Sequence, residues 1–208
     1  MVTILDGGMG RELKRSGAPF RQPEWSALAL IEAPETVEAV HRAYCAAGAE
    51  VITTNSYALV PFHIGAERFA SEGLKLAARA GQVARTATNA TPGVRVAGSL
   101  PPVCGSYRPD LFDPAVAAPL LAVLIKGMAP HVDLWLAETL SALDEARAVM
   151  AQLRGIRVRC GFRSRLLTDR ESAQRPASCA LAKVSRRQCK WPRWPGRRRC
   201  CSIAASQR

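Results

Sequence analysis

The feature that most constrains the fold is an alternation of short, apolar, β-branched runs with longer stretches whose apolar residues recur at helical spacing. The runs predict strands and the longer stretches predict helices, at residues 2–5, 34–48, 49–54, 66–87, 94–98, 114–128, 132–137 and 141–153. Ser141 is the predicted N-cap of the last helix, since a serine hydroxyl can accept a backbone N–H there. Strand–helix alternation is typical of parallel strands joined by crossover helices. The sequence therefore predicts an α/β fold with four βα units.

Each predicted strand ends in polar side chains. These are Asp6, then Asn55 and Tyr57, then Ser99, and then Glu138. In parallel α/β folds the ligand site lies at the carboxyl ends of the strands. We therefore expect these side chains to gather at one site.

The first strand, predicted to be fully buried, is followed by Asp6, Gly7 and Gly8. Glycine can adopt positive φ and lets a ligand approach the backbone closely. The alternative is a tight turn in which Asp6 caps the next segment. The glycines do not match the dinucleotide pattern G-x-G-x-x-G, and no acidic residue ends the second strand. A (β/α)8 barrel is therefore favoured over a doubly wound sheet, although four units make only half a barrel.

Charge and cysteine content divide the chain into two parts. Residues 1–155 hold 14 Lys and Arg against 15 Asp and Glu, whereas residues 156–208 hold 15 against 2. Five of the seven cysteines also lie in the second part. We expect residues 1–155 to form an ordinary globular domain, and residues 156–208 to be an aberrant, basic and disordered tail.

No secretory signal is visible at the start of the sequence. The longest apolar stretch, residues 115–125, is too short to cross a membrane. These observations predict a cytoplasmic protein without a membrane partner, whose cysteines are thiols.

Four motifs occur in order: LDGGMG followed by EL, ITTNSY, AGSLPP with Tyr107 after it, and ETL. Together they resemble the homocysteine S-methyltransferase family over residues 1–155, the N-terminal half of the family's barrel. The resemblance implies a partial (β/α)8 TIM barrel consisting of the first four βα units. It also implies methyl transfer from S-methylmethionine or S-adenosylmethionine to the thiol of homocysteine, which gives methionine. The identity of the donor and the oligomeric state do not follow from these motifs.

The resemblance assigns roles to the residues at the strand ends. Asp6 and Glu138 would hold the ammonium group of homocysteine, since two carboxylates on one cation form charge-assisted hydrogen bonds and fix its orientation. The main chain of Gly7–Gly8 would lie close to the ligand. Asn55 and Tyr57 would line the same mouth, with Tyr57 facing the methyl donor.

The family also uses zinc, held by three cysteines in an Asn-Cys motif and a Gly-Gly-Cys-Cys motif. Zinc keeps the homocysteine sulfur in its nucleophilic thiolate form. Neither motif is present, and the pair Cys200–Cys201 follows Arg197–Arg199 in place of glycines. His41 and His63 have no partner at metal-binding spacing and are predicted to be structural or exposed. We therefore expect the metal ligands to be absent and this chain to be inactive.

The family motifs end near Gly155, and the sequence becomes basic and rich in cysteine at the same place. A frameshift in the coding sequence would explain both changes. Residues 158–164 can be encoded so that the shifted frame reads Pro-Val-Trp-Val-Ser-Phe, a good fifth strand. Residues 200–207 can likewise give Leu-Phe-Asn-Cys-Ser-Gln-Pro, which contains the missing Asn-Cys motif. The alternative is a half-barrel binding protein whose basic arm, residues 191–199, contacts nucleic acid through its aromatic and cationic side chains. Nonspecific nucleic-acid binding is expected of so basic a segment whatever its origin.

Overall fold

The computed structural model of the chain describes residues 3–156 and 159–164, all within the compact unit Met1–Thr168. Its elements in chain order are α1 (Met9–Arg15), α2 (Ser26–Glu32), α3 (Pro34–Ala46), β1 (Val51–Thr53), α4 (Pro61–Ile64), α5 (Ala66–Thr88), β2 (Arg95–Leu100), η1 (Pro109–Leu111), α6 (Pro114–Met128), η2 (Ala129–His131), β3 (Leu134–Leu140), α7 (Leu143–Gln152) and β4 (Arg159–Ser164). The predicted disorder of residues 165–208 lies outside the described residues.

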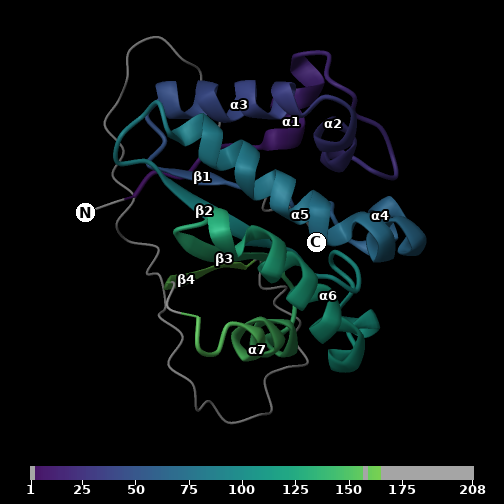
Figure 1. Ribbon diagram of the computed structural model, residues 1–208. Helices are drawn as coiled ribbons and strands as arrows, with labels where there is room; N and C mark the ends of the chain where they lie inside the picture. Colours follow the sequence, from purple (N-terminus) through teal and green to yellow (C-terminus); the bar gives the residue numbers. More distant parts are fainter. Residues whose placement is uncertain (1–2, 157–158, 165–208) are drawn as a thin grey trace, which may run out of the picture. The chain divides into compact units, whose positions relative to one another are not determined.

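The four strands form one parallel sheet in the order β1-β2-β3-β4, as Figure 1 shows. Three of them confirm the strands predicted at residues 49–54, 94–98 and 132–137. Each of these strands follows a long helix, so neighbouring parallel strands are joined by crossover helices. The α/β fold with consecutive βα units is therefore confirmed.

The prediction of a fully buried first strand is wrong. In the described part of the chain, this segment makes one parallel bridge, between Leu5 and Val51. Ile4 is 52% exposed and Leu5 is 42% exposed. An extended segment at the border of a sheet has a strand neighbour on one side only, so its apolar side chains keep much of their exposure. The segment still places Asp6 beside β1, because the N–H of Asp6 donates to the carbonyl of Val51 at 3.0 Å.

Four helices pack in chain order on one face of the sheet. α3 contacts α5, α5 contacts α6, and α6 contacts α7, and Figure 1 shows α3 and α5 running over β1 and β2. Val96 and Trp135 pack on this helix side, whereas Ala97 and Leu136 form a separate cluster on the opposite side. Successive side chains of a strand point to opposite faces, so consecutive core residues of β2 and β3 belong to clusters on the two sides of the sheet.

One stretch corrects the expectation that no apolar segment is long enough to cross a membrane. Residues Pro114–His131, which comprise α6 and η2, have a mean hydropathy of 1.3 over 18 residues and qualify by length and composition. A third of this stretch is buried within the protein, and α6 packs against both α5 and α7. A helix packed between two others needs apolar residues on both contact sides, and this explains the composition.

Gly127 lets α6 approach α5 closely, and we expect Gly127→Ala to destabilise the protein by about 2 kcal/mol. A Cβ at Gly127 would lie 2.8 Å from the carbonyl oxygen of Leu74 and 2.7 Å from Cβ of Ala77. Gly73→Ala is the matched control, because its new Cβ would meet only the side chain of Phe69, at 3.3 Å. Urea denaturation measures both. Equal stability of the two variants would contradict this packing.

The start of α7 differs from the prediction. The helix begins at Leu143 with Ala142 as its N-cap, so the proposed cap Ser141 lies one residue too early. The carboxylate of Glu145 takes the capping role, since its Oε2 accepts from the N–H groups of Ser141 and Ala142 at 2.6 and 2.9 Å. A glutamate in the first turn reaches back in this way in capping boxes. The short helices α1, α2 and α4 were not predicted.

The strand β4 corrects the expectation of disorder directly after residue 155. β4 runs parallel to β3, with Leu134 beside Arg159 and Ala137 beside Phe162. Strand pairing is made by main-chain groups, so a segment of unusual composition can still pair with an open strand edge. The rest of the predicted tail lies outside the described residues.

Candidate functional site

The six site residues predicted from the sequence line one cavity at the carboxyl ends of the strands. The cavity has a volume of about 230 Å³, and eleven described residues line it. They are Asp6, Gly7, Gly8, Met9, Gly10, Ser26, Thr53, Thr54, Asn55, Tyr57 and Glu138. Pockets for drug-sized ligands start at about 300 Å³, so this one suits a smaller metabolite. We call it the first cavity.

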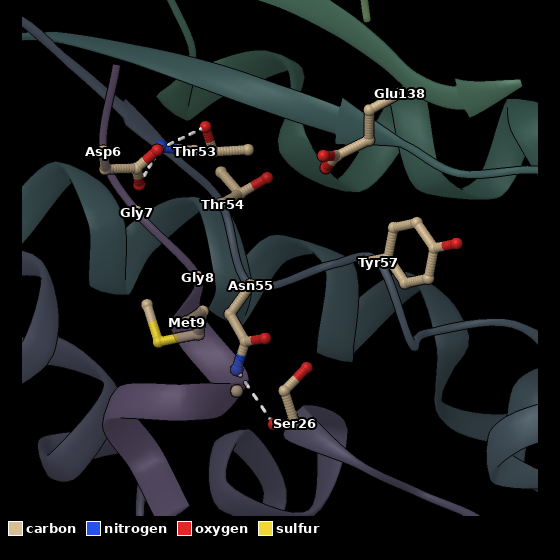
Figure 2. A pocket seen from close by; sticks show the side chains of 11 residues that line it. Asp6, Gly7, Gly8, Met9, Ser26, Thr53, Thr54, Asn55, Tyr57 and Glu138 are labelled. Carbon is tan, nitrogen blue, oxygen red and sulfur yellow. Dashed lines mark hydrogen bonds between the residues drawn. The ribbon is translucent and has the colours of Figure 1, made fainter. Parts of the chain in front are cut away.

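Asp6 reaches the first cavity from the segment beside β1. Its carboxylate accepts hydrogen bonds from the backbone N–H of Thr53 at 2.7 Å and from the Thr53 hydroxyl at 2.8 Å, as Figure 2 shows. The alternative in which Asp6 caps the next helix is wrong, because Gly8 is the N-cap of α1 and no side chain caps it. These two bonds hold the carboxylate in a fixed position at the wall of the cavity.

Glu138 enters the first cavity from the end of β3. Its Oε1 accepts a short hydrogen bond from the hydroxyl of Ser99 at the end of β2. Figure 2 shows the carboxylate turned toward Thr54 and the cavity. None of the eleven described lining residues is Lys or Arg. Two carboxylates in a cavity without a cationic lining residue favour a positively charged ligand group.

Asn55 and Tyr57 follow β1, and their polar groups are turned away from the two carboxylates. Asn55 is 3% exposed, and its Nδ2 donates to the carbonyl of Ser26 at 2.9 Å. The Tyr57 phenol shares a 2.7 Å hydrogen bond with the hydroxyl of Ser106. Burial raises the pKa of Tyr57. Asn55 therefore joins β1 to α2, and Tyr57 forms a wall of the cavity with its ring.

Gly7 and Gly8 line the cavity, but the sequence argument from positive φ is wrong for them. Neither is among the glycines with positive φ, and Gly8 has φ of −73°. A close approach explains Gly7, since a Cβ there would lie 2.8 Å from the hydroxyl oxygen of Tyr44. The absence of a Cβ at Gly7 thus leaves room for the end of the Tyr44 side chain of α3.

The sequence analysis did not identify a buried hydroxyl network behind the cavity. Thr54 Oγ1 lies 2.9 Å from Ser56 Oγ and accepts from the N–H of Ser99 at 2.9 Å. Ser56 Oγ donates to the carbonyl of Ser99 at 2.9 Å. The signal was present in the polar run Thr53–Ser56, where buried hydroxyls need hydrogen-bond partners. This network fixes the ends of β1 and β2 to each other.

A second cavity of about 450 Å³ adjoins the first, with which it shares Gly10, Ser26 and Tyr57. Its other described lining residues are Phe20, Trp25, Ala58, His63, Ser106, Tyr107 and Thr139. Phe20 and Trp25 meet edge to face, with ring centroids 5.8 Å apart. Burial lowers the pKa of His63, so that ring is neutral at pH 7. The second cavity is therefore aromatic and carries no cationic side chain among these residues.

The described residues do not fit a three-cysteine metal centre. No group of three His, Cys, Asp or Glu side chains comes together among them. Cys45 is buried beside the helix face of the sheet, and the sulfur of Cys104 lies 3.9 Å from the carbonyl oxygen of Asp113. Cys179, Cys189, Cys200 and Cys201 lie outside the described residues.

Comparisons with known proteins identify one family. A model of the homocysteine S-methyltransferase family matches residues 3–184, past residue 155 where the recognised motifs end. Homocysteine S-methyltransferase 1 of Brassica oleracea var. italica is 33% identical over 123 residues, which cover 53% of this chain and 36% of that protein. Selenocysteine methyltransferase of Astragalus bisulcatus is 38% identical over 87 residues, covering 41% and 26% respectively.

A solved structure gives the same result. The crystal structure of the homocysteine methyltransferase MmuM from Escherichia coli, metallated form, has a TM-score of 0.66 and 30% identity, and the match covers 81% of this chain and 64% of that one. Fold and site together define an α/β protein with a small ligand cavity at the carboxyl ends of its parallel strands. The chain belongs to the homocysteine S-methyltransferase family. It spans under two thirds of the MmuM chain and about a third of the Brassica relative.

Proposed function

We propose that the described residues are part of a (β/α)8 barrel and form the amino-acid-binding part of a homocysteine S-methyltransferase centre. The observation that carries this proposal is the convergence of Asp6 and Glu138 on one small cavity. Thr53 and Ser99 hold the two carboxylates from neighbouring strands. An ammonium group between them would receive charge-assisted hydrogen bonds from both sides.

The second cavity is the proposed site of the methyl donor. Its aromatic rings suit a sulfonium cation, because the face of an aromatic ring attracts a positive charge. S-methylmethionine and S-adenosylmethionine both carry such a cation. Tyr57 lines both cavities, so the thiol of one ligand and the methyl group of the other would meet beside its ring.

We propose further that this chain binds homocysteine without transferring a methyl group to it. Zinc would supply a thiolate nucleophile at neutral pH, but no three-residue ligand group is present among the described side chains. The predicted frameshift also leads us to expect an inactive chain. Sequencing the downstream DNA tests the frameshift: an open shifted frame that encodes Gly-Gly-Cys-Cys would support it. Methionine formation from S-methylmethionine and homocysteine, with zinc near one per chain, would contradict the proposed inactivity.

Calorimetric titration of the full chain tests amino-acid binding. We expect homocysteine to bind, and 4-mercaptobutyrate, which lacks the ammonium group, to bind at least tenfold more weakly, since a hydrogen bond to a charged group contributes about 1.5–3 kcal/mol. Equal affinity for the two thiols would contradict the role of Asp6 and Glu138. A nucleic-acid function is not proposed, because the basic arm lies outside the described residues and nothing in the site supports it.

A further inference from the structure

The end of β3 departs from regular strand geometry at Thr139. Ala137 and Leu140 both belong to the core on the helix side, although they are three residues apart. In a regular strand only residues an even number of positions apart share a face. The register with β4 shifts between Glu138 and Leu140, which marks a β-bulge. Thr139 is the additional residue of this bulge.

The backbone of Thr139 is strained. Its φ is 62°, a left-handed conformation that is an outlier for a β-branched residue. Such conformations persist where the surrounding structure holds them, and they cluster at functional sites. The bulge lets two consecutive side chains serve the same mouth: Glu138 lines the first cavity and Thr139 lines the second. In a regular strand the side chain after Glu138 would point to the opposite face of the sheet. The additional residue therefore brings the Thr139 side chain to the mouth.

The second cavity offers two kinds of contact. Phe20, Trp25 and Tyr107 supply aromatic surface, which attracts a cation. Tyr57, Ser106 and Thr139, which carry hydroxyl groups, are among its polar lining residues, with Ser26 and His63. Tyr57 and Ser106 are hydrogen-bonded to each other, and the Thr139 hydroxyl also interacts with the Tyr57 phenol, where it opposes the rise in pKa caused by burial. Hydroxyl groups of this kind can donate to a carboxylate.

We propose that Thr139 determines the specificity of the second cavity: its hydroxyl, with those of Tyr57 and Ser106, binds the carboxylate of an amino acid whose sulfonium end lies against the aromatic rings. This inference rests on the proposed function, which places the methyl donor in this cavity. It selects an amino-acid sulfonium over a simple sulfonium cation.

Calorimetry on the full chain with two probes tests the proposal. S-methylmethionine carries a carboxylate and an ammonium group in addition to its sulfonium, whereas trimethylsulfonium carries the sulfonium alone. We expect Thr139→Val, which keeps the branched shape, to weaken S-methylmethionine binding about tenfold, as the loss of a hydrogen bond to a charged group predicts. Trimethylsulfonium binding should stay within about twofold, because the aromatic contacts remain. Thr139→Ser should restore S-methylmethionine binding.

A second variant on another segment guards against a folding artefact. Ser106→Ala should show the same split between the two probes, since Ser106 bonds the Tyr57 phenol from the loop after β2. An equal loss for both probes, no loss for either, or no binding of S-methylmethionine by the unmodified chain would overturn the proposal. Homocysteine binding to the first cavity is measured separately. If homocysteine still binds, the proposal for Thr139 has failed while the proposed amino-acid site stands.

Discussion

Glu138→Gln is expected to lower the affinity of the chain for homocysteine at least tenfold. The substitution keeps the shape of the side chain and an oxygen that can accept from Ser99, but it removes the negative charge from the first cavity. Hydrogen bonds to charged groups contribute about 1.5–3 kcal/mol each, and 1.4 kcal/mol corresponds to a factor of ten. Isothermal titration with homocysteine measures the change directly.

Asp6→Asn should have an effect of similar size, because Asp6 faces the same cavity. Asp144→Asn is the matched control: its carboxylate is exposed and pairs with Arg147 on α7, and it should leave the affinity unchanged. Unchanged homocysteine binding in Glu138→Gln, with binding intact in the control, would show that the ammonium group does not contact Glu138.

Acidification from pH 7 to pH 4.5 is expected to reduce the free energy of unfolding by about 2–3 kcal/mol through His41 alone. This histidine of α3 is 0% exposed, and neither ring nitrogen has a hydrogen-bond partner among the residues that the structure describes. Burial lowers its pKa from 6.5 to about 3. Between these two values the unfolded chain binds a proton that the folded chain does not. The stabilisation is therefore complete above pH 6.5 and is lost as the pH falls toward 3.

Urea denaturation at the two pH values measures the loss. His41→Leu should lose less stability on acidification than the unmodified chain, because leucine cannot bind a proton. His131→Gln serves as the control, since His131 is partly exposed, and it should retain the full loss. The same pH dependence in His41→Leu and the unmodified chain would contradict the role of His41 as a buried neutral base.

Much of the candidate site could be predicted from the strand ends. Asp6, Asn55, Tyr57 and Glu138 lie far apart in the sequence yet line one cavity. Parallel strands have their carboxyl ends at the same edge of the sheet, so a polar residue after each strand is enough to predict that they meet. The helical spacing of apolar residues likewise predicted the long helices, such as α5, to within one residue at its C-terminus.

Other features depend on contacts between distant segments. At Gly7, a Cβ would project toward the Tyr44 hydroxyl on α3. The bulge at Thr139 appears only when the pairing of β3 with β4 is known. The bonds that hold Asp6 to Thr53, 47 residues away, have no local sequence pattern. Propensity and periodicity report only on neighbours along the chain, so they cannot reveal such contacts.

The sequence by itself determined the strands β1, β2 and β3, the helices α3, α5, α6 and α7, and the residues placed at the strand ends, because backbone propensity and hydrophobic period act within a few residues. Only the tertiary structure decided the orientation of those residues: Asp6 toward Thr53, Asn55 toward Ser26, and Thr139 into the second cavity. The physical reason is that a side chain takes its direction from partners on other strands and helices, which the fold brings near.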